Sequence, residues 1–118
     1  MQAISIEETG APSVMRLREV ETPHPAPGEA LIAVHAAGVN FADVVMRRGH
    51  IPSPLPLIPG VEGAGIVAAL GEGVEEVAVG DRVAWAPVMD AGAVVGSYAE
   101  YETVAANALL PVPDTVCL

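Results

Sequence analysis

The sequence predicts a mainly β protein: one domain in which several short strands form a closed or partly closed β-barrel, with one or two short helices. Hydrophobic residues make up 52% of the 118 residues but aromatic residues only 3%, so aliphatic side chains must fill the core. The 12 glycines and 11 prolines supply turns and exclude long helices. Short apolar stretches recur between these turn residues, which indicates a closed or partly closed β-barrel.

The N-terminal third is predicted to form a hairpin and then a buried strand. Residues 2–6 alternate between polar and apolar side chains and predict a strand, with residues 14–20 as its hairpin partner. Residues 22–29 hold three prolines and a glycine, which favours an extended loop. The nearly continuous apolar stretch 30–37 is typical of a strand buried on both faces.

A short helix is expected directly after this strand. Asn40 is a good N-cap, Asp43 stands three residues later in the capping-box position, and Gly49 suits the left-handed conformation that often follows a helix. Three apolar residues have the spacing of a buried stripe: Phe41, Val44 and Val45. The predicted helix is about two turns long.

The remainder of the chain is predicted to be further short strands. Residues 50–59 contain four prolines and cannot form a regular hydrogen-bonded ladder. Strands are expected over residues 65–70, 82–88, 98–104 and 109–112, and glycine turns separate the first two.

The composition excludes several classes of function. The net charge is −10, with five arginines and no lysine, which argues against binding to nucleic acid or anionic membranes. Cys117 is the one cysteine, so a disulfide framework and a cysteine-based metal site are excluded. No apolar stretch approaches the ~18 residues of a membrane span, and the N-terminus lacks the pattern of a signal peptide, so a cytoplasmic protein is expected.

Two interpretations of Asn40 and Asp43 remain open from the spacing. In the first, Asn40 caps the helix and Asp43 closes the capping box, with no catalytic role. In the second, the helix N-terminus faces a polar ligand and Asn40 places its amide beside that ligand. The two interpretations are compatible with each other.

The segment PGVEGAG, residues 59–65, is the second candidate region. Its glycines indicate unusual backbone geometry or close approach by another segment. Glu62 lies in an apolar stretch, so it is expected to be buried and to need a partner, for which Arg82 is one candidate; a structural ion pair is the favoured interpretation. The segment is not a phosphate-binding loop, because no lysine is present. His24, His35 and His50 lack converging partners, so no metal site is predicted.

Six motifs follow one another in order and span nearly the whole chain: AAGVNFAD, RRGHIPSPLPLIPGVEGAGIV, GEGV, VGDRVAW, GSYAEY and LLPVPD. This set resembles the zinc-free quinone oxidoreductase (zeta-crystallin-like) branch of the medium-chain dehydrogenase/reductase superfamily. The resemblance implies that residues 1–118 form the N-terminal catalytic, or substrate, domain, a GroES-like barrel. It also implies a partner, the Rossmann domain of the same protein, which is absent from this chain and binds NADPH (NADP) in the cleft between the domains.

The resemblance also implies roles for individual residues. The zinc-dependent relatives have a cysteine ligand where this chain has Asn40, and a histidine–glutamate pair where it has Val61 and Glu62, so no catalytic metal is expected. By analogy, Asn40, Phe41 and Asp43 line the nicotinamide end of the cofactor, and Asn40 and Asp43 are the catalytic candidates. Glu62 and Ile51 are assigned to the substrate pocket; many relatives carry a tyrosine in place of Ile51.

The implied reaction is hydride transfer from NADPH to a quinone or another conjugated carbonyl compound, a small-molecule acceptor. Most contacts to NADPH would come from the Rossmann domain, so the isolated chain is expected to be inactive and to bind the cofactor weakly. The full-length protein is expected to be a homodimer. Two alternatives remain: the corresponding domain of an enoyl-thioester reductase, and a non-enzymatic β-barrel binding module.

Overall fold

The protein is mainly β with one short α-helix, as the sequence predicts. The computed structural model describes residues 1–86 and 96–118. The elements of these residues are β1 (Gln2–Ile6), η1 (Pro12–Val14), β2 (Met15–Glu19), β3 (Glu29–Ala37), α1 (Phe41–Arg47), β4 (Gly63–Leu70), β5 (Arg82–Trp85), β6 (Tyr101–Ala105), η2 (Ala106–Ala108) and β7 (Leu110–Pro111), where η denotes a 3₁₀ helix.

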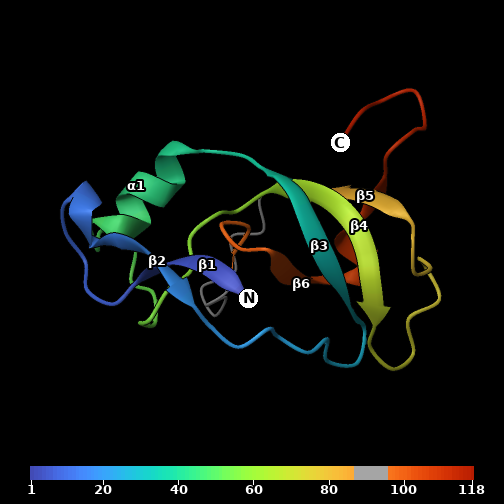
Figure 1. The fold of residues 1–118 in the computed structure, drawn as a ribbon, viewed down its shortest axis with the longest axis horizontal. Coiled ribbons are helices and arrows are strands. Elements are labelled where there is room, and N and C mark those ends of the chain that lie inside the picture. The colour runs from blue at the N-terminus through green and yellow to red at the C-terminus, as the bar shows by residue number, and fades with distance from the viewer. Residues whose placement is uncertain (87–95) are drawn as a thin grey trace.

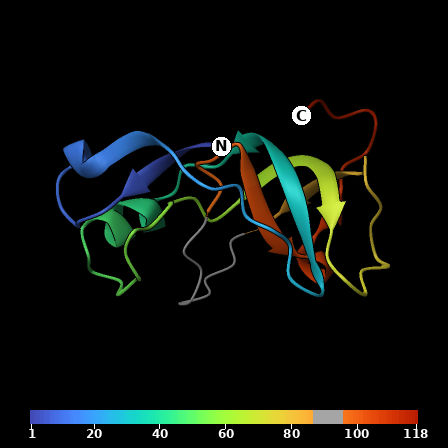
Figure 2. The ribbon, with the colours of Figure 1, turned by 60° about the horizontal axis from the view of Figure 1, so that its bottom comes forward.

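The strands form two antiparallel sheets at opposite ends of the molecule. β1 and β2 make a two-stranded hairpin, and the larger sheet has the order β6-β3-β4-β5-β7. The hairpin and α1 lie together at one end, and the five-stranded sheet lies at the other (Figures 1 and 2). Isolated bridges from β1 to Leu57 and Ala99 connect the hairpin to the segments that lead into the larger sheet. Among the described residues, the proline-rich segment 50–59 pairs with a strand at one isolated bridge, Ile6–Leu57, and not along a ladder, as its composition predicts.

The larger sheet is strongly curved, but the described residues do not show it closing into a barrel. β6 and β7 are its edge strands, and no ladder between them is seen within residues 1–86 and 96–118. Two register shifts in the β3–β4 pair, at Leu31/Ile32 and Val34/Ala36, increase the local twist. Close contact between these strands requires Gly65, because a Cβ there would lie 2.1 Å from the Ala33 carbonyl oxygen.

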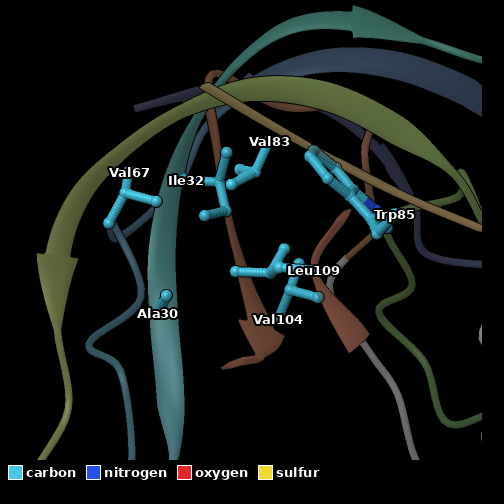
Figure 3. Packing of buried hydrophobic residues seen from close by; sticks show 7 residues of the cluster. All are labelled: Ala30, Ile32, Val67, Val83, Trp85, Val104 and Leu109. Carbon is cyan, nitrogen blue, oxygen red and sulfur yellow. The ribbon is translucent and has the colours of Figure 1, made fainter. Parts of the chain in front are cut away.

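The core lies on the concave side of this sheet. Its buried side chains gather beneath the arch of β4 (Figure 3). They are Ala30, Ile32, Val67, Val83, Trp85, Val104 and Leu109. Because aromatic residues are scarce, small aliphatic side chains and the one tryptophan fill this space, as the composition predicts.

The prediction that residues 30–37 are buried on both faces is wrong. In β3, Ala30 and Ile32 are fully buried, whereas residues 35–37 are exposed. The sheet covers the core with one face only, so side chains along each strand alternate between the core and the other face. The apolar residues of β3 that face outward are mostly alanines, which expose little apolar surface.

Several strand boundaries also differ from the prediction. The hairpin partner begins at Met15, because the 3₁₀ turn Pro12–Val14 occupies the residues before it. β4 begins two residues earlier than expected, at Gly63, and β6 begins three residues later, at Tyr101. β5 ends at Trp85, and residues 87 and 88 of the predicted strand lie outside the described residues.

The predicted helix is confirmed, but the residues that it buries are different. α1 has Asn40 as its N-cap, and Gly49 has a φ of 80° after its last turn. Phe41 is 74% exposed, whereas the buried residues of the helix are Asp43 and Arg47. Arg47 Nη1 donates to the Gly10 carbonyl at 2.6 Å, which fixes the helix against the turn after β1. In the described parts of the chain, no helix is long and apolar enough to cross a membrane.

Candidate functional site

The Asp43 carboxylate is the centre of a hydrogen-bonded cluster at the N-terminus of α1. Its Oδ2 atom accepts from the backbone N–H of Asn40 at 2.8 Å and from the Tyr98 hydroxyl at 3.0 Å. Its Oδ1 atom accepts from the Gly60 backbone N–H at 3.0 Å. Asp43 is only 7% exposed, so the three donors replace the water that a buried carboxylate loses. The capping-box role predicted for Asp43 is confirmed, and the carboxylate also binds two distant segments.

Asn40 and Glu62 form a side-chain pair beside this carboxylate. Asn40 Nδ2 donates to Glu62 Oε1 at 3.1 Å, and both residues are partly buried. The predicted structural ion pair of Glu62 is therefore wrong: within residues 1–86 and 96–118 no ion pair includes this carboxylate. Arg82 instead donates to the carbonyls of Pro113 and Val116 and so holds the C-terminal segment. The prediction that Glu62 needs a partner is confirmed, although the partner is a neutral amide.

The Asn40–Glu62 pair depends on a glycine in the preceding loop. A Cβ on Gly38 would lie 2.0 Å from Glu62 Oε1 and 2.5 Å from Glu62 Cγ. The backbone N–H of Gly38 donates to the Glu62 carbonyl at 3.2 Å, which brings the two segments together. Only a residue without a side chain leaves room for the carboxylate in this position.

Replacing Gly38 with alanine is expected to break the pair while leaving the fold intact. The nearest obstacle to the new methyl group is the Glu62 side chain, which can rotate away toward solvent. We expect the Asn40 side-chain NH₂ signals to move in an NMR spectrum, with a loss of unfolding free energy of about 1 kcal/mol. Unchanged Asn40 signals would show that the pair does not depend on Gly38.

Two further variants make this prediction specific. In a Glu62→Ala background the Gly38→Ala change should cost almost nothing, because the obstacle has been removed. Gly65→Ala should behave differently, because its Cβ would meet the Ala33 backbone carbonyl, which cannot rotate away. A large loss of stability is therefore expected for Gly65→Ala and a small one for Gly38→Ala.

Tyr98 is a member of the cluster that sequence analysis missed. Its hydroxyl donates to Asp43 although 55 residues separate the two. Burial and, to a lesser extent, the bonded Asp43 carboxylate raise the pKa of Tyr98 to about 12, so the hydroxyl stays protonated at physiological pH. No local pattern around residues 96–101 indicates this partner. Only the spatial arrangement of α1 and the segment before β6 does.

The structure brings together some of the predicted site residues but not all of them. Asn40, Asp43 and Glu62 form one cluster. Phe41 follows Asn40 in the sequence, and its side chain is exposed. Val39, on the other side of Asn40, is 83% exposed. Ile51 is half-buried in the loop after α1, and the hydrogen bonds of the cluster do not reach it. The roles assigned to these residues remain predictions.

The histidines of the chain lie outside this cluster. His24, His35 and His50 are all exposed. Among the residues that the structure describes, no three His, Cys, Asp or Glu side chains are grouped so that they can hold a metal ion. The accessible part of the cluster at α1 instead combines the Asn40 amide, the partly buried Glu62 carboxylate and the exposed apolar side chains of Val39 and Phe41, while the Asp43 carboxylate lies buried behind them. Such a surface suits an uncharged, planar polar ligand better than an anion or a metal.

Comparison with known proteins identifies the fold and the relatives of this chain. Residues 26–114 match the alcohol dehydrogenase GroES-like domain. A probable quinone oxidoreductase of Schizosaccharomyces pombe is 37% identical over 116 residues, which cover 98% of this chain and 33% of the relative. The chain thus spans about a third of that relative's length.

Solved structures show the same similarity. A mycobacterial protein complexed with NADPH is 41% identical, with a TM-score of 0.90 over 99% of this chain and 35% of that one. The Escherichia coli quinone oxidoreductase complexed with NADPH is 31% identical, with a TM-score of 0.88, and the match covers 99% of this chain and 35% of that one. The relatives of this chain include quinone oxidoreductases of the medium-chain dehydrogenase/reductase superfamily. The chain therefore belongs to the alcohol dehydrogenase GroES-like domain family.

Proposed function

We propose that this chain is the catalytic domain of an NADPH-dependent oxidoreductase that transfers hydride to a quinone or another conjugated carbonyl compound. The observation that carries the proposal is the Asn40–Glu62 pair, held by the buried Asp43 carboxylate and flanked by exposed apolar side chains. It lies at the position where the family resemblance implies the nicotinamide end of the cofactor. Its relatives include quinone oxidoreductases.

The residues of the cluster fit a nicotinamide ring. In NADPH the reduced ring is close to planar and uncharged and carries a carboxamide, so an amide such as that of Asn40 and an apolar side chain such as Phe41 are suitable partners. Phosphate groups find no cationic side chain in this cluster, because it contains no arginine and the chain contains no lysine. The nicotinamide end is therefore the part of NADPH assigned to this domain.

The rest of the cofactor is assigned to a second domain. The chain spans about a third of the length of its relatives, and we propose that a Rossmann domain of the same protein holds the nucleotide and its phosphates. When bound, NADPH supplies the hydride. This chain's residues orient the reacting groups and exclude water: Asn40 and Phe41 at the ring, and Glu62 beside the acceptor. We also propose that the complete protein is cytoplasmic and forms a homodimer.

The reading frame beyond the Leu118 codon tests the two-domain proposal directly. We expect it to continue into a strand, a glycine-rich turn and a helix, which together form the dinucleotide-binding unit. A stop codon at that point would overturn the enzyme proposal and favour a binding module. If the frame continues, NADPH oxidation by the complete polypeptide should be measured with a quinone and with an enoyl thioester. Preference for the thioester would move the assignment to the enoyl-thioester reductases.

Replacing Asn40 tests the site itself. In the complete polypeptide, Asn40→Ala is expected to lower the rate of acceptor reduction by roughly tenfold to a hundredfold, because the ring loses an orienting contact. The cap that this variant also loses costs only about 1 kcal/mol of stability. Asn40→Ser keeps the cap and removes the amide, so it should lose rate without losing stability.

The matched control for this prediction is Asn107→Ala. Asn107 is an exposed asparagine in η2, outside the cluster. Its replacement is expected to change neither rate nor stability. If the two Asn40 variants reduce the acceptor as fast as the unchanged protein does, Asn40 is only a helix cap and the proposed site is wrong.

A further inference from the structure

Tyr98 is fixed on both sides of its backbone. Its N–H donates to the Pro59 carbonyl at 3.0 Å, and its carbonyl accepts from the Ile4 N–H at 2.8 Å. The ring also packs on Gly60, where a Cβ would lie 2.9 Å from Tyr98 Cδ1. The tyrosine is thus held between β1 and the loop that precedes β4, and its ring has little freedom to move.

From this fixed position the hydroxyl reaches the Asp43 carboxylate. The bond is 3.0 Å long, and it ends on the same Oδ2 atom that accepts the Asn40 backbone N–H. Because burial raises the pKa of Tyr98 to about 12, the hydroxyl remains a donor throughout the physiological pH range. Bonds to a charged acceptor are stronger than bonds between neutral groups, so this contact restricts the rotation of the Asp43 side chain.

Hydrogen bonds connect both members of the Asn40–Glu62 pair to this carboxylate, one directly and one through a neighbouring residue. Asn40 is bound directly through its backbone N–H to Oδ2. Glu62 is linked through Gly60, two residues earlier, whose N–H donates to Oδ1 at 3.0 Å. A rotation of the Asp43 carboxylate would therefore move both segments and change the geometry of the Nδ2–Oε1 contact between them.

We propose that Tyr98 is a positioning residue: its hydroxyl, acting through Asp43, sets the relative position of the Asn40 amide and the Glu62 carboxylate. The catalytic part of this inference rests on the proposed function, whereas the structural part does not. The Tyr98 hydroxyl bonds Asp43 and neither Asn40 nor Glu62. Its effect on the geometry of the pair is therefore indirect.

The structural part is tested on this chain by Tyr98→Phe, which keeps the ring and removes the hydroxyl. We expect the NMR signals of the Asn40 side-chain NH₂ to shift, and hydrogen exchange at the Asn40 and Gly60 amides to accelerate by about tenfold. Amides in β3 and β4 serve as the internal reference, because a general loss of stability would accelerate them equally. The matched control is Tyr101→Phe: Tyr101 is half-buried, and its hydroxyl bonds no residue in the described part of the chain.

If Tyr98→Phe leaves the Asn40 and Gly60 amides unchanged, or accelerates all amides alike, the positioning role is overturned. The catalytic part is tested in the complete polypeptide, where Tyr98→Phe is expected to lower kcat by about fivefold and to change KM for NADPH by less than about twofold. A normal kcat for Tyr98→Phe combined with a low kcat for Asn40→Ala overturns the catalytic part of this inference and leaves the proposed function in place. A normal kcat for Asn40→Ala overturns the proposed site and the catalytic part of the inference with it.

Discussion

Replacing Asp43 with alanine is expected to lower the free energy of unfolding by about 4 kcal/mol, which is a large part of the ~5–15 kcal/mol typical of a domain. The carboxylate accepts three hydrogen bonds, from Asn40, Gly60 and Tyr98. Without it these donors lose their common partner in a buried region, and each unsatisfied donor costs about 1–3 kcal/mol. Urea denaturation followed by circular dichroism measures the loss.

Two further variants serve as a control and as an intermediate case for this prediction. Asp114→Ala removes a fully exposed carboxylate whose only ion pair among the described residues is a 3.7 Å contact with Arg82, so almost no change in the free energy of unfolding is expected. Asp43→Asn keeps one acceptor oxygen but turns an NH₂ group toward a donor, so an intermediate loss is expected. A loss below about 1 kcal/mol for Asp43→Ala would mean that water satisfies the three donors and that the cluster is not tightly held.

The contacts of this cluster between residues close in sequence could be predicted. The contacts between residues far apart in sequence could not. The three-residue spacing of Asn40 and Asp43 predicts a capping box, because one turn of helix brings these positions together whatever surrounds them. The contacts of Asp43 with Gly60 and Tyr98 bridge 17 and 55 residues. Such contacts depend on how β1, the proline-rich loop and β6 assemble, and residue types carry no signal for that.

The orientation of α1 was predicted incorrectly for a related reason. The rule that apolar residues face the core assigns Phe41 to the buried side, but the helix buries Asp43 and Arg47 instead. The segments beneath it present backbone groups that need partners, such as the Gly10 carbonyl and the Gly60 N–H. Departures from binary patterning of this kind are expected at functional sites, and here the departure places Phe41 on the surface beside Asn40.

A second buried carboxylate, in the larger sheet, could also be predicted only in part from the sequence. Alternation along β6 places Glu102 on the same face as Val104, which belongs to the core. Strand periodicity predicts that a residue at this position points inward, but it does not say whether a charge there is tolerated. Burial raises the pKa of Glu102 to about 8. In the described residues, Glu102 Oε2 and Trp85 Nε1 each lack a hydrogen-bond partner.

The raised pKa of Glu102 has a definite consequence for stability. The folded state holds this proton up to about pH 8, whereas the unfolded chain releases it near the usual value of about 4.3. The stabilising contribution of protonated Glu102 to the free energy of unfolding is therefore fully present below pH ~4.3 and is lost as the pH rises toward about 8. We expect Glu102 to lower the free energy of unfolding by roughly 4 kcal/mol between pH 5 and pH 8, measured against a variant without this proton.

Glu102→Gln is that variant, because its amide stays neutral at every pH. Near pH 5 the two proteins should be similarly stable, and at pH 8–9 the glutamine variant should be more stable by several kcal/mol. Trp85 is the one tryptophan of the chain and lies in the same core, so its fluorescence reports both unfolding and the ionisation of Glu102. Glu21→Gln, at an exposed position, controls for the change in net charge and should leave the pH dependence as it is. A constant difference between Glu102→Gln and the unchanged protein from pH 5 to pH 9 would contradict a raised pKa, because only a proton bound unequally by the two states makes that difference vary with pH.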